Sequence, residues 1–394
     1  MPRFVLAAAV ASILAATLTP AGTLLEPEFT GCLVCGARGV SDAIVNVILF
    51  APLGIALALH GRVGRRAVLL GGMLSCGVEF AQIFIPGRDP SLGDVVANTL
   101  GAAAGQAIFQ VAGRWLLPPA RVAARLSLLA AGLMLVVFSA TARLLEPSLP
   151  AGALRAWYTP DLPDLEWYRG RVLRAKLGPI DVRPGRPLDP DAVRGLLLEG
   201  VPLRIDVTTG EAVGGLAPLL AIEDEDHRES VLVGPDREDL VFRYRPRAAR
   251  WRLDQPDLRL RQAFTSVRPG DTARITIRRQ GRGVCLALNR VARCDVGNSV
   301  GRGWALLYYP RHLPVWAYTL LEAGWVAGLA FPIGLWARRR PETALALALL
   351  AVALFVPFTG LIHTPPHQLV GAGSGLVLGR MLQAWRRAVS ARHA

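Results

Sequence analysis

The sequence predicts a mainly α-helical polytopic membrane protein of about eight transmembrane helices, with an all-β sandwich of jelly-roll type inserted outside the cytoplasm. Three observations predict this fold class. Hydrophobic residues make up 52% of the chain and the mean hydropathy is +0.36, although the middle third is charged. Apolar runs of spanning length flank that third on both sides. The middle itself is rich in short strand-forming segments. We therefore expect a membrane block at 1–145, a sandwich at 146–312 and a second membrane block at 313–394.

The helices are predicted from eight apolar runs that are long enough to cross a bilayer. The first run could instead be a cleaved signal peptide. The sequence "PAGTLLEPEF" that follows it offers no small-residue cleavage site, so a retained helix is favoured. The runs lie at about 4–25, 43–60, 67–85, 94–113, 126–145, 314–336, 343–362 and 368–385.

The distribution of arginine predicts the topology. Arginine clusters occur in every second loop and after the last run, whereas the opposite short loops hold only Arg38 and Arg88. Positive charge is retained on the cytoplasmic side of a membrane. We therefore expect both termini in the cytoplasm of a bacterial inner membrane, and residues 146–312 on its extracytoplasmic side.

The formal charge of +14 does not indicate a nucleic-acid partner. Nearly all the basic residues are arginine, with Lys176 the only lysine, and no basic stripe with interleaved aromatic residues accompanies them. Apolar spans and short arginine clusters explain the charge through membrane topology. The expected partner is the lipid bilayer.

The middle region is predicted to fold as strands. Its strand-like segments are separated by Gly, Pro and Asp at the intervals of a sandwich, and no helix-length amphipathic pattern interrupts them. A β-sandwich of jelly-roll type is the expected architecture. The segments are "LRIDVTTG", "ESVLVGP", "LVFRYRP", "RITIRRQ", "VCLALN" and "GWALLYYP".

Two cysteine pairs fall in the exported part of the predicted topology. Cys285 and Cys294 are equidistant from the dipeptide "NR" at 289–290, so a two-residue hairpin turn would place them opposite each other as a cross-strand disulfide. Cys32 and Cys35 in "GCLVCG" lack the second ligand pair of a metal site. They are interpreted as a structural disulfide or as two thiols without a special role, and a redox pair is disfavoured.

A faint repeat joins the two membrane blocks. The segment "FAPLGIALALHGRVGRR" has a counterpart in "AFPIGLWARRRPE", and each is followed by two further apolar runs. In the second block "HTPPHQLVGAGSG" stands where "PGRDPSLGDVVANTLG" stands in the first. The second copy is therefore expected to lack the polar groups of the first.

Polar side chains of the first block recur at helical spacing, so each set occupies one face of its helix. Glu79 lies about two turns before Pro86, roughly 10 Å inside the expected outer boundary. Arg88, on the short outer loop, is the nearest counter-charge for Glu79, Asp89 or Asp94. The sets are Asp42 and Asn46; Ser75, Glu79 and Gln82; and Asp94, Asn98, Gly101 and Gly105.

Two interpretations of these polar residues stay open. They could form a packing seam, in which Asp42 and Asp94 cap helices and Glu79 pairs with Arg88. They could instead form an outward-facing pocket that binds a headgroup or carries out acid–base chemistry, because an ionisable residue within a membrane is a functional candidate by default.

The pattern does not indicate a hydrolase or a metal enzyme. Ser75 and Ser91 have no nearby histidine that could activate them. His363 and His367 in "HTPPHQ" have neither the spacing nor the carboxylate partner of a metal site. We expect no metal and no cofactor.

The segment "NVILFAPLG" followed by "SCGVEFAQIFIPGRDPSLGDVVANTLGAAAG" resembles the VanZ-like family over about residues 40–113. The order and spacing of the matching residues are specific. More weakly, the strand pattern of the middle region resembles a laminin-G or concanavalin-like domain, a fold that often binds carbohydrate or protein. The matching residues are Asn46, Phe50, Pro52, Gly54, Glu79, Gln82, Arg88, Ser91, Asp94, Asn98 and Gly101.

The resemblance implies a cell-envelope protein, and the family takes its name from a protein associated with resistance to the glycopeptide teicoplanin. We expect the polar pocket to bind an envelope lipid or glycan through Asn46, Glu79, Gln82, Arg88, Ser91, Asp94 and Asn98. One alternative is a membrane enzyme that modifies an envelope lipid, with Glu79 or Asp94 as general acid or base. Another is a transporter or flippase, which the missing polar groups of the second block disfavour.

Overall fold

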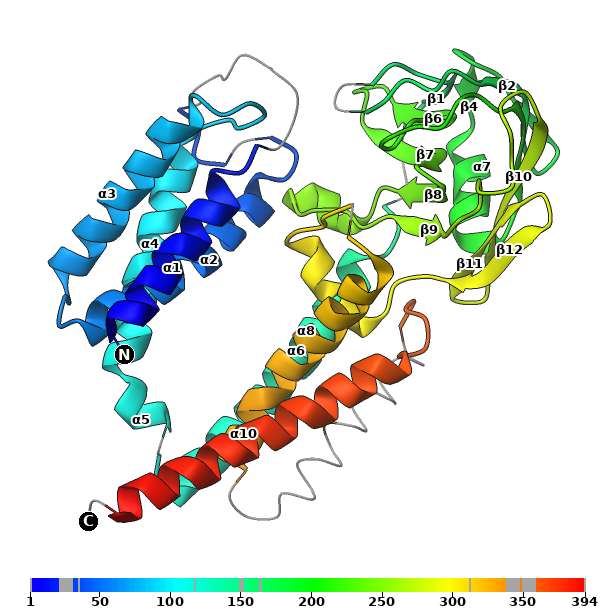
Figure 1. Ribbon diagram of the computed structural model, residues 1–394. Coiled ribbons are helices and arrows are strands. Elements are labelled where there is room, and N and C mark those ends of the chain that lie inside the picture. The colour runs from blue at the N-terminus through cyan, green and yellow to red at the C-terminus, as the bar shows by residue number, and fades with distance from the viewer. Residues whose placement is uncertain are drawn as a thin grey trace.

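The structure is a computed structural model that describes residues 2–20, 31–34, 36–116, 118–148, 152–162, 165–311, 313–337, 348 and 359–392. Figure 1 shows two groups of helices and a β domain. Helices α1 to α4 lie side by side, α6, α8 and α10 form a second group, and the β domain sits beyond one end of that second group.

The first helix group is held by apolar packing between its members. Its core includes Ile13 of α1, Phe50 and Leu53 of α2, and Val78 of α3. The short helix α5 leads on toward the second group, where the indole of Trp336 donates to the carbonyl oxygen of Trp115 at 2.6 Å. The helices are α1 (Pro2–Thr17), α2 (Gly39–Leu59), α3 (Arg65–Gln82), α4 (Leu92–Gln110) and α5 (Ala112–Leu116).

The second helix group has its own apolar core. Met134 and Phe138 of α6 pack with Val326 and Ile333 of α8. The chain enters the β domain from α6 and leaves it into α8, so both helices end beside that domain (Figure 1). The helices are α6 (Ala120–Leu144), α8 (Val315–Trp336) and α10 (Pro366–Arg392).

Among the described residues, three helices are long and apolar enough to cross a membrane: α2, α6 and α8. The sequence-based count of about eight spans is therefore not supported. Helix α1 has 16 residues, α3 opens with two arginines, and α4 is built largely of small and polar residues. The predicted run at 343–362 lies almost wholly outside the described residues.

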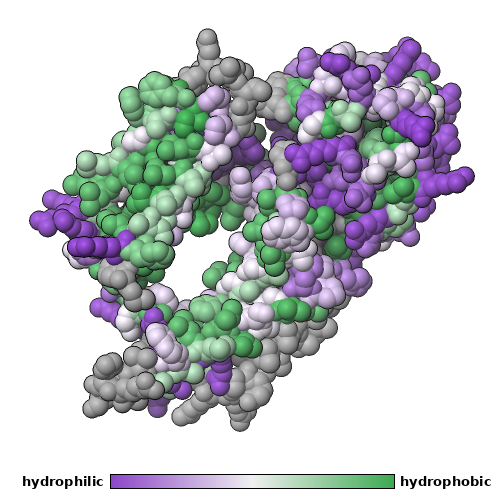
Figure 2. Space-filling model, in the orientation of Figure 1, coloured by the Kyte–Doolittle hydropathy of each residue, from purple (hydrophilic) through white to green (hydrophobic). Residues whose placement is uncertain are grey.

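The surface of the helices is nevertheless apolar. Figure 2 shows hydrophobic residues over the α1–α4 group and hydrophilic residues over the β domain. On α3 and just after it, Leu69, Met73, Phe80 and Phe84 are exposed. A contiguous apolar surface of this kind needs a partner, and a lipid environment supplies one. The chain is thus a membrane protein with a β domain.

The β domain is a sandwich of two antiparallel six-stranded sheets. The sheet orders are β4-β1-β6-β7-β8-β9 and β12-β11-β10-β5-β2-β3. Alternate residues such as Ile205, Ile275, Ile222, Val233 and Phe242 point between the sheets and form the core. The strands are β1 (Leu154–Tyr158), β2 (Arg171–Leu177), β3 (Ile180–Val182), β4 (Pro187–Leu188), β5 (Leu203–Thr208), β6 (Leu220–Asp224), β7 (Glu229–Asp236), β8 (Asp239–Tyr244), β9 (Leu258–Leu260), β10 (Thr272–Gln280), β11 (Gly283–Leu288) and β12 (Val291–Val296).

Short helical pieces complete the domain, and they lie at its connections. The predicted domain boundaries at 145 and 312 stay predictions. The pieces are α7 (Pro190–Arg194), the π-helical turn η1 (Gly195–Glu199), and the 3₁₀-helices η2 (Arg247–Trp251) and η3 (Val300–Leu306).

The predicted strand "GWALLYYP" is wrong. Its first part belongs to η3 and the rest has no regular structure. The aromatic residues that suggested a strand pack against α8 instead, where the rings of Trp304 and Tyr309 lie 6.3 and 5.8 Å from that of Tyr318. Contacts with a neighbouring helix have overridden the local strand preference.

The predicted hairpin at 289–290 is confirmed, and Cys285 is bonded to Cys294 across it. Leu286 pairs with Arg293, which is the register that sets the two cysteines opposite each other. Asn289 adopts a left-handed φ of 52°, as a two-residue turn requires. Cys35 lies outside the described residues, so the interpretation of the Cys32 and Cys35 pair stays a prediction.

Helices α2 and α4 meet backbone to backbone along a seam of glycines: Gly54, Gly101 and Gly105. A Cβ built on Gly105 would lie 1.9 Å from the carbonyl oxygen of Ala51, and one on Gly54 would lie 2.0 Å from that of Ala102. No side chain fits at such distances. The seam therefore sets how closely the two helices approach.

Helices α8 and α10 repeat this seam with Gly334, Gly375 and Gly379. A Cβ on Gly379 would lie 2.3 Å from the carbonyl oxygen of Phe331, and one on Gly334 would lie 2.2 Å from that of Leu376. Position 54 thus corresponds to 334 and position 105 to 379. Equivalent residue numbers differ by 280 between α2 and α8 and by 274 between α4 and α10. These differences hold at each of the three glycine contacts. The faint repeat seen in the sequence is a repeat of packing.

Candidate functional site

The predicted polar residues of the first helix group gather at one end of α2, α3 and α4. That end is also where the group meets the sandwich, because the amides of Val40 and Ser41 in the first turn of α2 both donate to the carbonyl oxygen of Arg252, at 3.3 Å. The cluster and the β domain therefore lie on the same side of the helices.

The link between α2 and α4 is a hydrogen bond from Asn46 to Asp94. The Asn46 amide donates to the Asp94 carboxylate at 2.7 Å. Both residues are half-buried. After this bond, the Asn46 amide and the Asp94 carboxylate can each form further hydrogen bonds.

Glu79 joins α3 to the start of α4. Its side chain is 5% exposed, and its Oε2 accepts from the backbone N–H of Ser91 at 2.9 Å. The Ser91 hydroxyl accepts from the N–H of Asp94 at 3.1 Å and so caps α4. The interpretation of Asp94 as the cap is wrong, because α4 begins at Leu92 and Asp94 lies inside its first turn. Two carboxylates thus lie at the positive end of one helix.

The deeper part of the cluster joins α3 to α4 and α1. Asn98 is 1% exposed and donates to the Ser75 hydroxyl at 3.0 Å. The other end of the same amide, Oδ1, is buried and accepts no hydrogen bond from the described residues. Gln82 donates to the carbonyl oxygen of Thr17, at the end of α1, at 3.0 Å.

Arg88 does not serve as the predicted counter-charge. Its guanidinium donates to the carbonyl oxygens of Thr19 at 2.8 and 3.0 Å and of Ala16 at 2.9 Å, where α1 ends. Within the described ranges, no ion pair joins it to Glu79 or Asp94. A cation at a helix C-terminus donates hydrogen bonds to the free carbonyl groups and interacts favourably with the negative end of the helix dipole. Residue spacing does not predict this contact, because it does not locate the end of α1.

Asp42 lies outside the cluster. It is exposed on the first turn of α2, and α2 has no side-chain cap. The structure thus brings together Asn46, Ser75, Glu79, Gln82, Ser91, Asp94 and Asn98. Asp42 interacts with Asp94 through charge but forms no hydrogen bond with this set among the described residues, and Arg88 bonds to the end of α1 instead.

Comparison with known families covers this region. Residues 8–113 match the VanZ/LLP1 family model. The match includes α1 to α4 and every residue of the cluster, and it supports the VanZ-like resemblance. We call residues 8–113 the VanZ-like block. No curated protein and no solved structure matches the chain significantly, so the laminin-G or concanavalin-like resemblance is not shown.

The second helix pair carries a polar cluster that was not predicted from the sequence. Glu322 of α8 contacts Nε2 of His367 at 2.9 Å, and Gln368 of α10 donates to the same carboxylate oxygen at 2.8 Å. The glycine register equates Gln368 with Asp94, and Glu322 with Asp42. The second copy thus has polar groups at these two positions, which the sequence comparison did not predict. By the same register Val326 corresponds to Asn46 and Ala372 to Asn98, so the second copy does lack those two amides of the first.

This second cluster is bound to the sandwich side of the molecule. Arg302 of η3 lies 3.3 Å from the Glu322 carboxylate, and the amide of Gly301 donates to the Gln368 side chain at 3.0 Å. The predicted lack of a carboxylate partner for His367 is also wrong, since Glu322 provides one. Among the described residues, no group of three or more His, Cys, Asp or Glu side chains is arranged to hold a metal ion.

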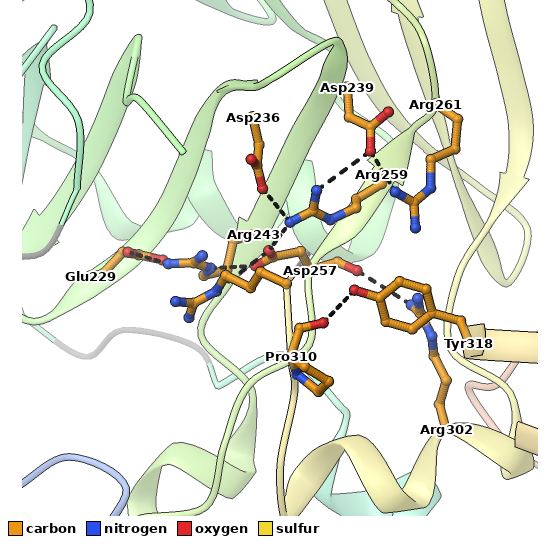
Figure 3. Close-up of polar contacts among 11 residues, drawn as sticks. Glu229, Asp236, Asp239, Arg243, Asp257, Arg259, Arg261, Arg302, Pro310 and Tyr318 are labelled. Atoms are coloured by element: carbon orange, nitrogen blue, oxygen red, sulfur yellow. Dashed lines mark hydrogen bonds and ion pairs between the residues drawn. The ribbon is translucent and has the colours of Figure 1, made fainter. Parts of the chain in front are cut away.

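A buried ion network on strands β7 to β9 lies next to η3 (Figure 3). Arg243 is 4% exposed and lies 2.6 Å from Asp257 and 3.4 Å from Glu229. Burial alone would raise the pKa of Asp257, but the positive charges of Arg243 and Arg311 outweigh it and hold this pKa at about 2. Asp257 is therefore ionised at neutral pH.

The network continues through Arg259, which lies 2.5 Å from Asp236 and 3.0 Å from Asp257. Arg302 of η3 donates to the backbone oxygen of Asp257 at 3.3 Å. The same arginine pairs with Glu322, so charged contacts run without interruption from the sandwich to α8. Paired buried charges of this kind fix a geometry, because a partner left alone would be strongly destabilising.

Proposed function

We propose that the protein is a multi-pass protein of a bacterial inner membrane that binds an envelope lipid or glycan component through the polar cluster of the VanZ-like block. The observation that carries the proposal is the burial of Glu79 and Asn98 among helices whose outer surface is apolar. Burying such groups in a membrane costs free energy, so they are found where they serve the structure or bind a ligand. The unpartnered Oδ1 of Asn98 provides an acceptor for a ligand hydroxyl or amide.

In this proposal the remaining helices also lie in the bilayer around the three apolar ones. Both termini are cytoplasmic, and residues 146–312 are extracytoplasmic. A phosphatase fused after residue 230 is expected to be active, and one fused after residue 64 to be inactive. Equal activity at the two positions would overturn this topology.

The test of the site is complementation of a deletion strain under envelope stress, including exposure to a teicoplanin-type glycopeptide. Glu79→Gln and Asp94→Asn keep shape and hydrogen-bonding groups but remove charge. Both variants are expected to reach normal membrane abundance and to fail to complement. Asp42→Asn is the matched control, because it removes a carboxylate from the same end of the block without touching the cluster.

Full complementation by both cluster variants would reject the binding site and leave a packing seam. Protein abundance is measured by blot for each strain, so that loss of the protein is not mistaken for loss of function. A glycopeptide phenotype in the deletion strain would extend the proposal to resistance, and its absence would remove that part alone.

The enzyme alternative predicts a chemically modified lipid, which the binding proposal does not. If Glu79 or Asp94 acts as general acid or base on an envelope lipid, a modified lipid should disappear from extracts of the deletion strain and of the Glu79→Gln strain. An unchanged lipid profile in both strains favours binding. The repeated seam resembles the parallel repeats of some transporters. Transport is disfavoured because the polar side chains of the second cluster, Glu322 and Gln368, already bond to Arg302 and Gly301 and so do not line a substrate path.

A further inference from the structure

A cavity of about 230 Å³ lies where the sandwich meets the end of α6. Ala142 and Leu145, at the end of this apolar helix, form one side of it, and Gly360 and Leu361, which precede α10, form another. Because α6 is one of the helices that can cross a membrane, its end marks the level of the lipid headgroups. The cavity is thus at the depth where a lipid changes from apolar to charged.

The interior of the cavity is apolar. Leu197, Phe242, Leu258 and Ile277 line it from the sandwich and are all buried. Tyr244 and Asn298 also line the cavity, but the Asn298 amide donates to the Tyr244 hydroxyl at 3.1 Å and that hydroxyl donates to the carbonyl oxygen of Leu145 at 3.0 Å. Because these polar groups bond to the protein, the apolar part of the space favours hydrocarbon over water.

The rim of the cavity is basic. Arg247, Arg279 and Arg282 line it together with a single carboxylate, Glu146, which is paired with Arg247 at 3.1 Å. Arg279 donates to the carbonyl oxygens of Leu197 at 3.0 Å and Gly281 at 3.3 Å, and within the described ranges it forms no ion pair with a carboxylate. The rim therefore carries more positive than negative charge, which attracts a phosphate group.

We propose that this cavity binds an anionic phospholipid of the surrounding membrane, with its phosphate against the arginine rim and the upper part of one acyl chain in the apolar interior. The site is separate from the cluster of the VanZ-like block, because its lining comes from the sandwich, α6 and the segment before α10. Arg279 and Arg282 recognise the headgroup charge, and Leu197 and Phe242 select for an attached chain.

The experiment uses the full-length protein in nanodiscs that contain a phosphatidylglycerol analogue with a photoactivatable group on one acyl chain. Cross-linked peptides are identified by mass spectrometry. We expect labelling of the peptides that contain Leu197 and Phe242, reduced about tenfold when a phosphatidylcholine analogue replaces the anionic lipid, which corresponds to the loss of one charged contact.

The variant Arg279→Gln with Arg282→Gln is expected to lower that labelling about tenfold. Arg274→Gln is the matched control, because Arg274 lies on the same strand β10 but is exposed and paired with Asp206. Labelling confined to the transmembrane helices, or equal labelling in the double variant and the control, would overturn the proposal. Loss of labelling upon addition of inorganic phosphate alone would also overturn it, since the site would then recognise a free anion.

Discussion

The two helix pairs α2/α4 and α8/α10 share one seam and differ at one end. In both pairs three glycines bring the helices into backbone contact at equivalent positions. At the end nearest the sandwich, Asp94 of the first pair is bonded to Asn46 within its own block. Its equivalent, Gln368, is bonded to Glu322 and to the backbone of η3.

The difference indicates what the seam and the polar end each contribute. The seam is retained in both pairs, so it serves as a scaffold for two adjacent helices. The polar end of the second pair fastens the sandwich to the membrane helices through Arg302 and Glu322. In the VanZ-like block the sandwich bonds to the backbone at the start of α2, and among the described residues no side chain of the cluster bonds to it. Under the proposed function those side chains serve a ligand instead.

The largest expected effect comes from filling the shared seam. Gly105→Ala and Gly379→Ala each place a Cβ where a carbonyl oxygen already lies, so each should destabilise the protein by about 3 kcal/mol. Gly77→Ala is the control, since nothing lies within 4 Å of its Cβ position. Thermal unfolding of the purified protein in detergent measures the change. If Gly105→Ala unfolded at the control's temperature, the seam would not be essential in the first pair.

The next effect distinguishes the two polar ends. Glu322→Gln removes the charge that faces the half-buried Arg302 and should cost about 2 kcal/mol, less than the loss of a fully buried pair because the side chains are partly exposed and the amide still accepts hydrogen bonds. Asp42→Asn makes the same change at the equivalent position of α2, where the side chain is exposed, and should cost nothing measurable. Thermal unfolding measures the stability of both variants. An equal loss of stability in the two would contradict the difference between the two polar ends.

The smallest effect concerns acid. Since the pKa of Asp257 is held at about 2, below its unfolded value of about 3.9, its ionised form stabilises the fold above pH 4. That stabilisation, about 2 kcal/mol, is lost progressively as the pH falls from 4 toward 2. Asp257→Asn should be less stable at pH 7 and should lose less stability between pH 4 and 2. Parallel pH profiles for the wild type and the variant would show that this carboxylate is not the responsible group.

Much of the candidate site could be predicted from the sequence. Glu79, Gln82, Asp94 and Asn98 fall on single helical faces, so their convergence follows from spacing once the helices pack together. The hairpin at 289–290 was predictable for the same reason, because a two-residue turn fixes the register of both strands.

What could not be predicted depends on contacts between distant segments. Arg88 reaches the end of α1, some 70 residues away, where a carbonyl group competes successfully with the nearby carboxylates. Arg243 lies on β8 and Asp257 directly precedes β9, and their burial as an ion pair depends on the pairing of segments that sequence spacing does not bring together. The count of about eight spans is not supported because α1 is short, α3 opens with two arginines and α4 is rich in small and polar residues, none of which the apolar runs showed as helix limits.

The contact between Arg252 and the start of α2 has a mechanical consequence. The first turn of a helix has amides without partners, and here a backbone oxygen of the sandwich accepts from two of them at 3.3 Å. The sandwich is joined covalently to the membrane helices α6 and α8. At the start of α2 it holds the VanZ-like block through these two long hydrogen bonds and one from the Arg252 guanidinium to the carbonyl oxygen of Val34. A force that pulls the sandwich away from the helices would therefore be borne by the two tethers, and the hydrogen bonds at the start of α2 would break first.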